Sequence, residues 1–428
     1  MPPRHGMSAY IMRMIAFLTC GLLLAGCARL TAPLPNTNAL DGSNLSLRPA
    51  SGTWLCGAPL SARTKNDLLQ RGDEPLAGYK ALYKFKAGAD GAQPYGGMIA
   101  LNGKLYGTTY DGGSGGYGTV FALTASGKEG PLYNFTAGND GAYPCSGLAV
   151  ANGKLYGTTQ SGGTRGWGTL FEVSTSGQGH VIYSFKAGKD GAAPYAGLLY
   201  HNGKVYGTTV EGGATGWGTV FVATTSGSER VLYSFKAGKD GARPYGGLTG
   251  VNGTLYGTTQ QGGKYGWGTV FSVSTSGKER LLYSFKAGKD GGYPFDGVTT
   301  LNAKLYGTTK EGGSAGYGTI FDVSLTGQER VLYSFKSGSD GAYPYAGLIV
   351  LNGVLYGTTL EGGKPGWGTV FAANTSGKER VLHTFAAVPD GASPFARLTD
   401  LNGVLYGTTQ GGGVKANGGW GTAFSLAP

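Results

Sequence analysis

The chain has 428 residues and a formal net charge of +11, with 83 glycines, 12% aromatic residues and only 14% charged residues. So few charges exclude a disordered polyelectrolyte, and so much glycine excludes a mainly helical protein. The composition is typical of an all-β protein with many turns.

The first 26 residues predict an export signal. Arg4 and Arg13 precede the apolar run Met14–Leu24, which is too short for a comfortable membrane span. The run ends in Leu-Ala-Gly-Cys at residues 24–27, which resembles the lipobox of bacterial lipoproteins. This resemblance implies that the signal is removed and that Cys27 is acylated, whereas a plain secretory signal is the alternative. We expect an exported protein with a lipid anchor in the cell membrane, or in the outer membrane if the cell has two, facing the periplasm or the exterior.

Removal of the signal leaves 33 basic and 24 acidic residues, a net charge of +9. In an exported chain this excess favours anionic surface polymers or lipid headgroups as partners, or serves only solubility. Nucleic acid is not expected as a partner. Residues 27–52 are rich in Pro, Asn and Ser and show no hydrophobic period, so they predict a flexible tether.

Two cysteines remain once Cys20 has left with the signal and Cys27 carries lipid. Cys145 occupies a position that holds Tyr or Phe in the other repeats, and Cys56 lies in the segment 53–80, outside the repeats. Both would be in an oxidising compartment. We therefore predict a Cys56–Cys145 disulfide that joins this N-terminal segment to the repeat region and packs it there.

Residues 81–428 repeat with a period of fifty residues, marked by seven copies of the stretch Leu-Tyr-Gly-Thr-Thr in which one leucine is replaced by Val205. The first period contains four runs with strand character. They are Leu82–Phe85, Gly97–Leu101, Lys104–Thr109 and Gly118–Leu123. The pair Asn102-Gly103 joins two of these runs and is typical of a tight hairpin, because both residues must adopt positive φ. It recurs in every period except one, which has Asn302-Ala303.

Four strands per period, repeated seven times, predict an all-β, seven-bladed β-propeller over residues 81–428. The array begins with Leu82–Phe85 and ends with Gly421–Leu426, a run of the fourth type. We therefore expect the N-terminal strand to complete the last blade and close the ring. A right-handed β-solenoid is the alternative, and it is disfavoured because its coils are shorter and contain fewer hairpins.

The unit L-Y-G-T-T-x-x-G-G-x-x-G-[WY]-G-T-V-F, followed by L-Y-S-F, resembles the GloVer (Gloeo/Verruco) tandem repeat of bacterial surface and exported proteins. The resemblance covers Leu82 to Leu426, and the last period departs from it by a three-residue insertion within Gly411–Thr422. It implies a repeat architecture with varied anchors, and no established activity, catalytic residue or cofactor.

Alternation along a four-stranded blade places the two short hairpin turns on one face of the disc and the long loops on the other. Binding residues tend to lie on loops held by a rigid scaffold, so the long-loop face is the candidate binding surface. Its aromatic side chains suit carbohydrate, and its lysines suit anionic polymers. The candidates are Trp167, Trp217, Trp267, Trp367, Trp420, Tyr195 and Tyr245. Packing between blades is the competing explanation for residues that recur in every repeat.

Two further candidates break the repeat. Asp296 and Arg397 replace small residues at the start of the innermost run, which places them near the mouth of the central channel. Surface drift is the competing explanation.

The sequence favours a binding or scaffolding module of the cell envelope, with a carbohydrate, an anionic surface polymer or a protein as partner. A polysaccharide-active hydrolase or lyase using the long-loop face is one alternative, and a purely structural envelope protein is another. The three histidines after the signal, His180, His201 and His383, share no loop, so they support neither a metal cage nor a Ser-His-Asp triad. No catalytic residue, metal ligand or cofactor is assigned.

Overall fold

The computed structural model describes residues 78–414 and 419–428. These residues all fall within Leu68–Pro428, one of the two units into which the chain divides. The predicted signal and tether lie outside the described residues, as do Cys27, Cys56 and nearly all of the segment 53–80.

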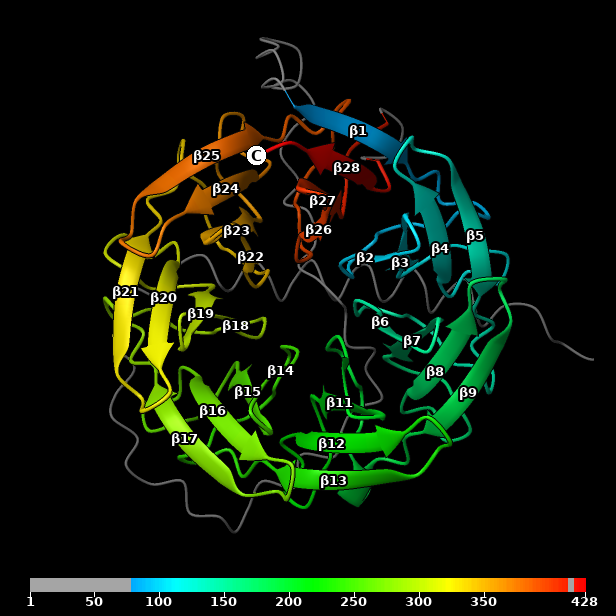
Figure 1. Ribbon diagram of the computed structural model, residues 1–428, viewed down its shortest axis with the longest axis horizontal. Coiled ribbons are helices and arrows are strands. Elements are labelled where there is room, and N and C mark those ends of the chain that lie inside the picture. Colours follow the sequence, from blue (N-terminus) through cyan, green and yellow to red (C-terminus); the bar gives the residue numbers. More distant parts are fainter. Residues whose placement is uncertain (1–77, 415–418) are drawn as a thin grey trace, which may run out of the picture. The chain divides into compact units, whose positions relative to one another are not determined.

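The described residues form seven four-stranded antiparallel sheets arranged as blades around a central axis (Figure 1). This confirms the predicted seven-bladed β-propeller and excludes the solenoid. We number the blades 1 to 7 by the chain order of their innermost strands. Apart from these strands, one short 3-10 turn, η2 (Gly188–Asp190), is described. No helix among the described residues has the length and apolar character needed to cross a membrane.

Each blade contributes one strand to each of four concentric layers. The innermost strands are β2 (Ile99–Leu101), β6 (Ala149–Ala151), β10 (Leu199–His201), β14 (Thr249–Val251), β18 (Thr299–Leu301), β22 (Ile349–Leu351) and β26 (Thr399–Leu401). The second strands are β3 (Lys104–Thr109), β7 (Lys154–Thr159), β11 (Lys204–Thr209), β15 (Thr254–Thr259), β19 (Lys304–Thr309), β23 (Val354–Thr359) and β27 (Val404–Thr409).

The outer two layers complete the blades. The third strands are β4 (Thr119–Thr124), β8 (Thr169–Ser174), β12 (Thr219–Thr224), β16 (Thr269–Ser274), β20 (Thr319–Ser324), β24 (Thr369–Ala373) and β28 (Thr422–Leu426). The outermost strands are β5 (Glu129–Asn134), β9 (Gly179–Ser184), β13 (Glu229–Ser234), β17 (Glu279–Ser284), β21 (Glu329–Ser334), β25 (Glu379–Thr384) and β1 (Tyr79–Lys84).

The N-terminal strand closes the ring, as predicted. In Figure 1, β1 lies along the outer side of β28, and the two strands pair antiparallel from Tyr79 opposite Leu426 to Lys84 opposite Thr422. The first strand of the array thereby completes blade 7, whose other strands come from the end of the chain. The N-terminal strand is thus paired within a complete four-stranded blade. It begins at Tyr79, three residues before the predicted Leu82.

The recurring Leu-Tyr-Gly-Thr-Thr stretch forms the second strand of each blade, and its residues are fixed by packing. In blade 1, Leu105 is fully buried. A Cβ on Gly107 would lie only 2.6 Å from Cζ of Phe121 on the neighbouring strand, so only glycine leaves room for that ring. The hydroxyl of Thr109 lies 2.9 Å from that of Thr119 and also donates to the carbonyl of Asp111. The stretch therefore recurs because each blade packs in the same way.

Neighbouring blades are joined by pairs of buried phenylalanines. Phe135, which follows the outermost strand of blade 1, meets Phe171 of blade 2 edge to face, with ring centroids 5.0 Å apart. The same pair occurs at all seven seams, with centroids 5.0–5.3 Å apart. Edge-to-face contact adds stability beyond the apolar area that it buries. The hydrophobic core is thus a ring of seven repeated seams.

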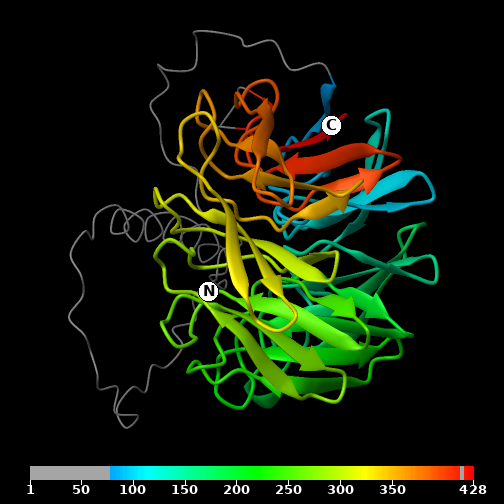
Figure 2. The ribbon, with the colours of Figure 1, turned by 60° about the vertical axis from the view of Figure 1, so that its left-hand side comes forward.

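Antiparallel pairing fixes which turns share a face. The turns between the first and second strands and between the third and fourth strands lie at one end of each blade, and the long loops lie at the other end. Figure 2 shows the blades obliquely, with connecting turns at both edges of the disc.

Candidate functional site

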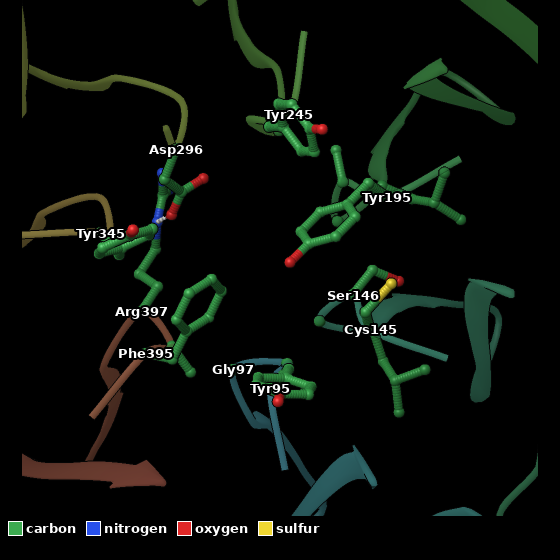
Figure 3. A pocket seen from close by; sticks show the side chains of 18 of the residues that line it. Tyr95, Gly97, Cys145, Ser146, Tyr195, Tyr245, Asp296, Tyr345, Phe395 and Arg397 are labelled. Atoms are coloured by element: carbon green, nitrogen blue, oxygen red, sulfur yellow. Dashed lines mark hydrogen bonds and ion pairs between the residues drawn. The ribbon is translucent and has the colours of Figure 1, made fainter. Parts of the chain in front are cut away.

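A cavity of about 240 Å³ lies on the propeller axis, where the segments that lead into the innermost strands converge (Figure 3). Each repeat contributes the residue that follows a proline, and most repeats also contribute some of the residues after it. The contributing residues of the first kind are Tyr95, Cys145, Tyr195, Tyr245, Phe295, Tyr345 and Phe395. The predicted candidates Tyr195, Tyr245, Asp296 and Arg397 therefore all line one cavity.

Small residues follow the aromatic position because the blades approach one another closely at the axis. A Cβ on Gly97 would lie 2.8 Å from the carbonyl oxygen of Arg397, across the seam between blades 1 and 7. A Cβ on Gly147 would lie 3.2 Å from the carbonyl oxygen of Gly97. Close backbone approach thus accounts for glycine at this position, and a larger residue here is a departure that requires its own explanation.

The aromatic residues form an almost continuous chain of contacts around the axis. Tyr245 stacks on Phe295 at a centroid distance of 4.8 Å, and Phe295 meets Tyr345 at 5.0 Å. Tyr345 meets Phe395 at 5.0 Å, and Phe395 meets Tyr95 at 5.4 Å. The chain is therefore made mostly of tightly packed rings.

Cys145 is the one member of this set without a ring. It is buried and disulfide-bonded, and its partner lies outside the described residues. The Cys56–Cys145 pairing stays a prediction. Cys145 itself is one of the residues that line the cavity.

The hydroxyl of Tyr195 differs from that of its counterpart Tyr95. Tyr95 accepts a hydrogen bond of 2.8 Å from Nε2 of Gln410. Tyr195 is 6% exposed, and among the described residues its buried hydroxyl has no hydrogen-bond partner. Figure 3 shows this hydroxyl pointing toward the axis. Burial raises the pKa of Tyr195 well above its usual range, so the side chain is a neutral O–H group.

Asp296 and Arg397 form an ion pair although they are 101 residues apart in sequence. Nε of Arg397 donates to Oδ2 of Asp296 over 3.2 Å, and Nη2 donates to the carbonyl of Gly297 over 3.2 Å. The same carboxylate accepts 2.6 Å and 2.7 Å hydrogen bonds from the backbone N–H groups of Gly297 and Gly347. These contacts connect blades 5, 6 and 7, and Figure 3 shows the pair at one side of the cavity.

The five candidate tryptophans lie apart from the cavity lining and divide into two groups. Trp167 is 37% exposed and Trp217 is 39% exposed. Trp267 packs against Tyr293 with ring centroids 4.8 Å apart, whereas Trp367 and Trp420 are partly buried against hydrophobic clusters. The packing explanation therefore fits the second group, and the first group remains available to a partner.

Tyr265 is an exposed aromatic residue that the sequence analysis missed. It is 43% exposed, and the ammonium groups of Lys264 and Lys286 lie 5.1 Å and 5.8 Å from its ring centre. The corresponding residues in blades 2 and 3 are Arg165 and Thr215. The sequence could therefore have identified Tyr265, because it is a single aromatic residue at a position that varies among the repeats.

The long loops are held rigidly by hydrogen bonds. Asp90 accepts a bond of 2.8 Å from the hydroxyl of Tyr83 and another of 3.0 Å from the backbone N–H of Lys86. Ala92 exchanges two backbone hydrogen bonds with Asp111 in the neighbouring loop, of 2.8 Å and 3.1 Å. The repeated aspartates thus shape the loops. Within the described part of the chain, no group of three or more His, Cys, Asp or Glu residues is placed to hold a metal ion.

The fold defines a β-propeller module. It has two candidate binding surfaces, the axial cavity and the exposed aromatic residues of the long loops. The chain belongs to the family of the Gloeobacter/Verrucomicrobia repeat, whose model matches residues 73–244 and 200–424. None of the curated proteins matches the chain.

The chain is similar to several solved structures at low sequence identity. A gluconolactonase from Xanthomonas campestris is 16% identical, with a TM-score of 0.41, over 82% of this chain and 89% of that chain. The β-propeller domain of the Trilobed protease from Pyrococcus furiosus is 8% identical, with a TM-score of 0.43, over 77% of this chain and 94% of that domain.

Proposed function

We propose that this protein is a lipid-anchored, extracytoplasmic binding module of the cell envelope whose long-loop face binds a surface polysaccharide. The observation that carries the proposal is the aromatic arc, which we define as Trp167, Trp217 and Tyr265. These residues lie in equivalent loops of the consecutive blades 2, 3 and 4, and they are the exposed large hydrophobic side chains among the described residues. Exposed aromatic residues in a row are typical of a binding surface.

The chemistry of the arc favours an acidic polysaccharide. Flat aromatic rings pack against the apolar faces of sugar rings. Lys264 and Lys286 beside Tyr265 add positive charge for acidic groups, in a chain that is basic overall. A polymer whose successive sugars contact the protein fits aromatic rings on successive blades better than a small compact ligand does.

Binding of the full chain, purified in detergent, to polygalacturonate and to uncharged dextran tests this proposal. We expect saturable binding of polygalacturonate, weakened at least tenfold by Trp217→Ala without a change in Tm. Trp267→Phe keeps a ring on Tyr293 and should leave binding unchanged. No binding of either polymer would favour the structural alternative, and shortened chains in the mixture would favour a polysaccharide-active enzyme.

Anchoring is tested separately. Wild-type protein should partition with membranes and incorporate labelled fatty acid, and Cys27→Ser should abolish both. Incorporation of label into Cys27→Ser would contradict the lipobox prediction.

A further inference from the structure

We propose that the axial cavity is a second binding site, which takes a small organic carboxylate through Arg397 and the hydroxyl of Tyr195. The cavity lining contains none of the residues of the aromatic arc. The inference therefore goes beyond the proposed polysaccharide-binding function and does not depend on it.

Arg397 is accommodated by a specific neighbour. The other six repeats have glycine at this position: Gly97, Gly147, Gly197, Gly247, Gly297 and Gly347. A Cβ on Gly347 would collide with Nη2 of Arg397 and would lie 2.8 Å from Oδ2 of Asp296. The guanidinium thus occupies space that a glycine in the preceding blade leaves open, and it is held there by a carboxylate from the blade before that.

The hydrogen bonds within the Asp296–Arg397 pair use the acceptors of the carboxylate more fully than the donors of the guanidinium. The carboxylate of Asp296 accepts from two backbone N–H groups and from Arg397, so most of its acceptor capacity is used. Arg397 uses Nε and Nη2 in its bonds to described residues, whereas a guanidinium carries five N–H groups. Its side chain is 32% exposed and lines the cavity. The pair therefore offers donors, and the fork of an arginine matches a carboxylate in two hydrogen bonds.

The buried hydroxyl of Tyr195 is a further donor in the cavity lining. A buried O–H group without a partner is unfavourable, and a ligand acceptor would remove that penalty. Aromatic side chains of the other repeats, among them Tyr245 and Phe295, line the same cavity. The site thus combines a cation, a neutral donor and aromatic walls for the apolar part of a ligand.

The cavity volume suits a small molecule. About 240 Å³ equals roughly eight water molecules in the liquid. Pockets for drug-sized ligands begin at about 300 Å³. A carboxylate with few carbon atoms fits this volume.

Calorimetric titration of the full chain in detergent with acetate, lactate, glucuronate and glucose tests the proposal. Glucuronate and glucose differ only in whether the sixth carbon is a carboxylate. We expect at least one of the three carboxylates to bind at one site per chain, at least tenfold more tightly than glucose. Tyr195→Phe should weaken that binding several-fold without lowering the Tm of the unliganded protein.

The matched control variant restores the residues of the other repeats. Asp296→Ala with Arg397→Gly reproduces Ala196 and Gly197 of blade 3, so this double variant should fold with an unchanged Tm. It should bind the carboxylate at least tenfold more weakly and polygalacturonate as the wild type does, whereas Trp217→Ala should show the reverse. Absence of binding by all three carboxylates, equal binding of glucose, or unchanged binding by the folded double variant would each overturn the proposal.

Discussion

Tyr79 of β1 stacks on His383 of β25, with ring centroids 3.7 Å apart and ring planes within 3° of each other. The hydroxyl of Tyr79 donates to the carbonyl of Asp390 over 2.6 Å, and Nε2 of His383 lies 2.9 Å from the carboxylate of the same residue. At the corresponding seam between blades 5 and 6, Glu379 occupies the position of Tyr79, and Tyr333 occupies the position of His383. A stacked pair with one ring from β1 and one from β25 therefore joins the start of the array to blade 6.

Tyr79→Ala should destabilise the ring by about 2–4 kcal/mol, because it removes a packed ring and a hydrogen bond from the strand that completes blade 7. Tyr79→Phe keeps the stack and should cost only about 0.5–1.5 kcal/mol. Urea unfolding of the two variants checks this order. Equal losses of stability would show that the hydroxyl, and not the stack, holds β1.

Stability should fall as pH rises from about 4.5 to about 7. Burial first, and then the nearby carboxylate of Asp340, raise the pKa of Glu379 to about 7 from an ordinary value of 4.5. The pKa is raised to about 7 by the same leading cause at Glu129, Glu229 and Glu329. The folded state therefore binds more protons than the unfolded state in this window, so their contribution to stability is present below pH 4.5 and is lost by pH 7.

Urea unfolding midpoints at pH 5 and pH 7.5 measure this effect. Glu379→Gln removes one titrating group, so the midpoint of the variant should fall less between the two pH values than that of the wild type. An identical fall in both proteins would show that Glu379 does not contribute to the pH dependence of stability.

Ala303→Gly should stabilise the protein by about 1 kcal/mol. Ala303 follows Asn302 in the hairpin turn of blade 5 and has a φ of 58°, where an L-residue is strained. The corresponding Gly203 has a φ of 74° and open space beside it, so Gly203→Ala should cost a similar amount. Thermal unfolding of both variants provides the check, and a stability gain from Gly203→Ala would contradict the turn-strain explanation.

Asp322→Asn should cost about 1–3 kcal/mol. The Asp322 side chain is 2% exposed and accepts bonds from Nζ of Lys304 at 3.0 Å and from Nε and Nη2 of Arg330 at 2.9 and 2.6 Å. Removing the charge weakens three charge-assisted hydrogen bonds in a buried setting.

Glu172→Gln provides the matched comparison for Asp322. Glu172 occupies the equivalent position in blade 2, is 15% exposed and forms an ion pair with Lys154 at 2.7 Å. Its loss should cost about 0.2–1 kcal/mol, as for an exposed ion pair. Urea unfolding measures both, and a larger loss for Glu172→Gln would contradict this ranking.

The strand limits show how far local pattern reaches. The second strand was predicted to span Lys104–Thr109, and β3 has these limits. The innermost strand of blade 1 was predicted to begin at Gly97, but β2 begins at Ile99, because only residues 99–101 find ladder partners in β3. Gly97 lies instead where the blades converge on the axis, and neither its φ preference nor its hydrophobicity indicates that change.

The sequence alone determined the number of blades, the hairpin turns and the strand that closes the ring, because these depend on a fixed period and on neighbours close in the chain. Only the tertiary structure brought Asp296 to Arg397 and left the hydroxyl of Tyr195 buried without a hydrogen-bond partner among residues 78–414 and 419–428. It also decided which tryptophans are exposed: Tyr293 covers Trp267, whereas Ala193, whose N–H donates to the carbonyl of Trp167, carries no ring. Each of these outcomes depends on a residue from another blade, and sequence spacing does not specify how side chains from different blades meet.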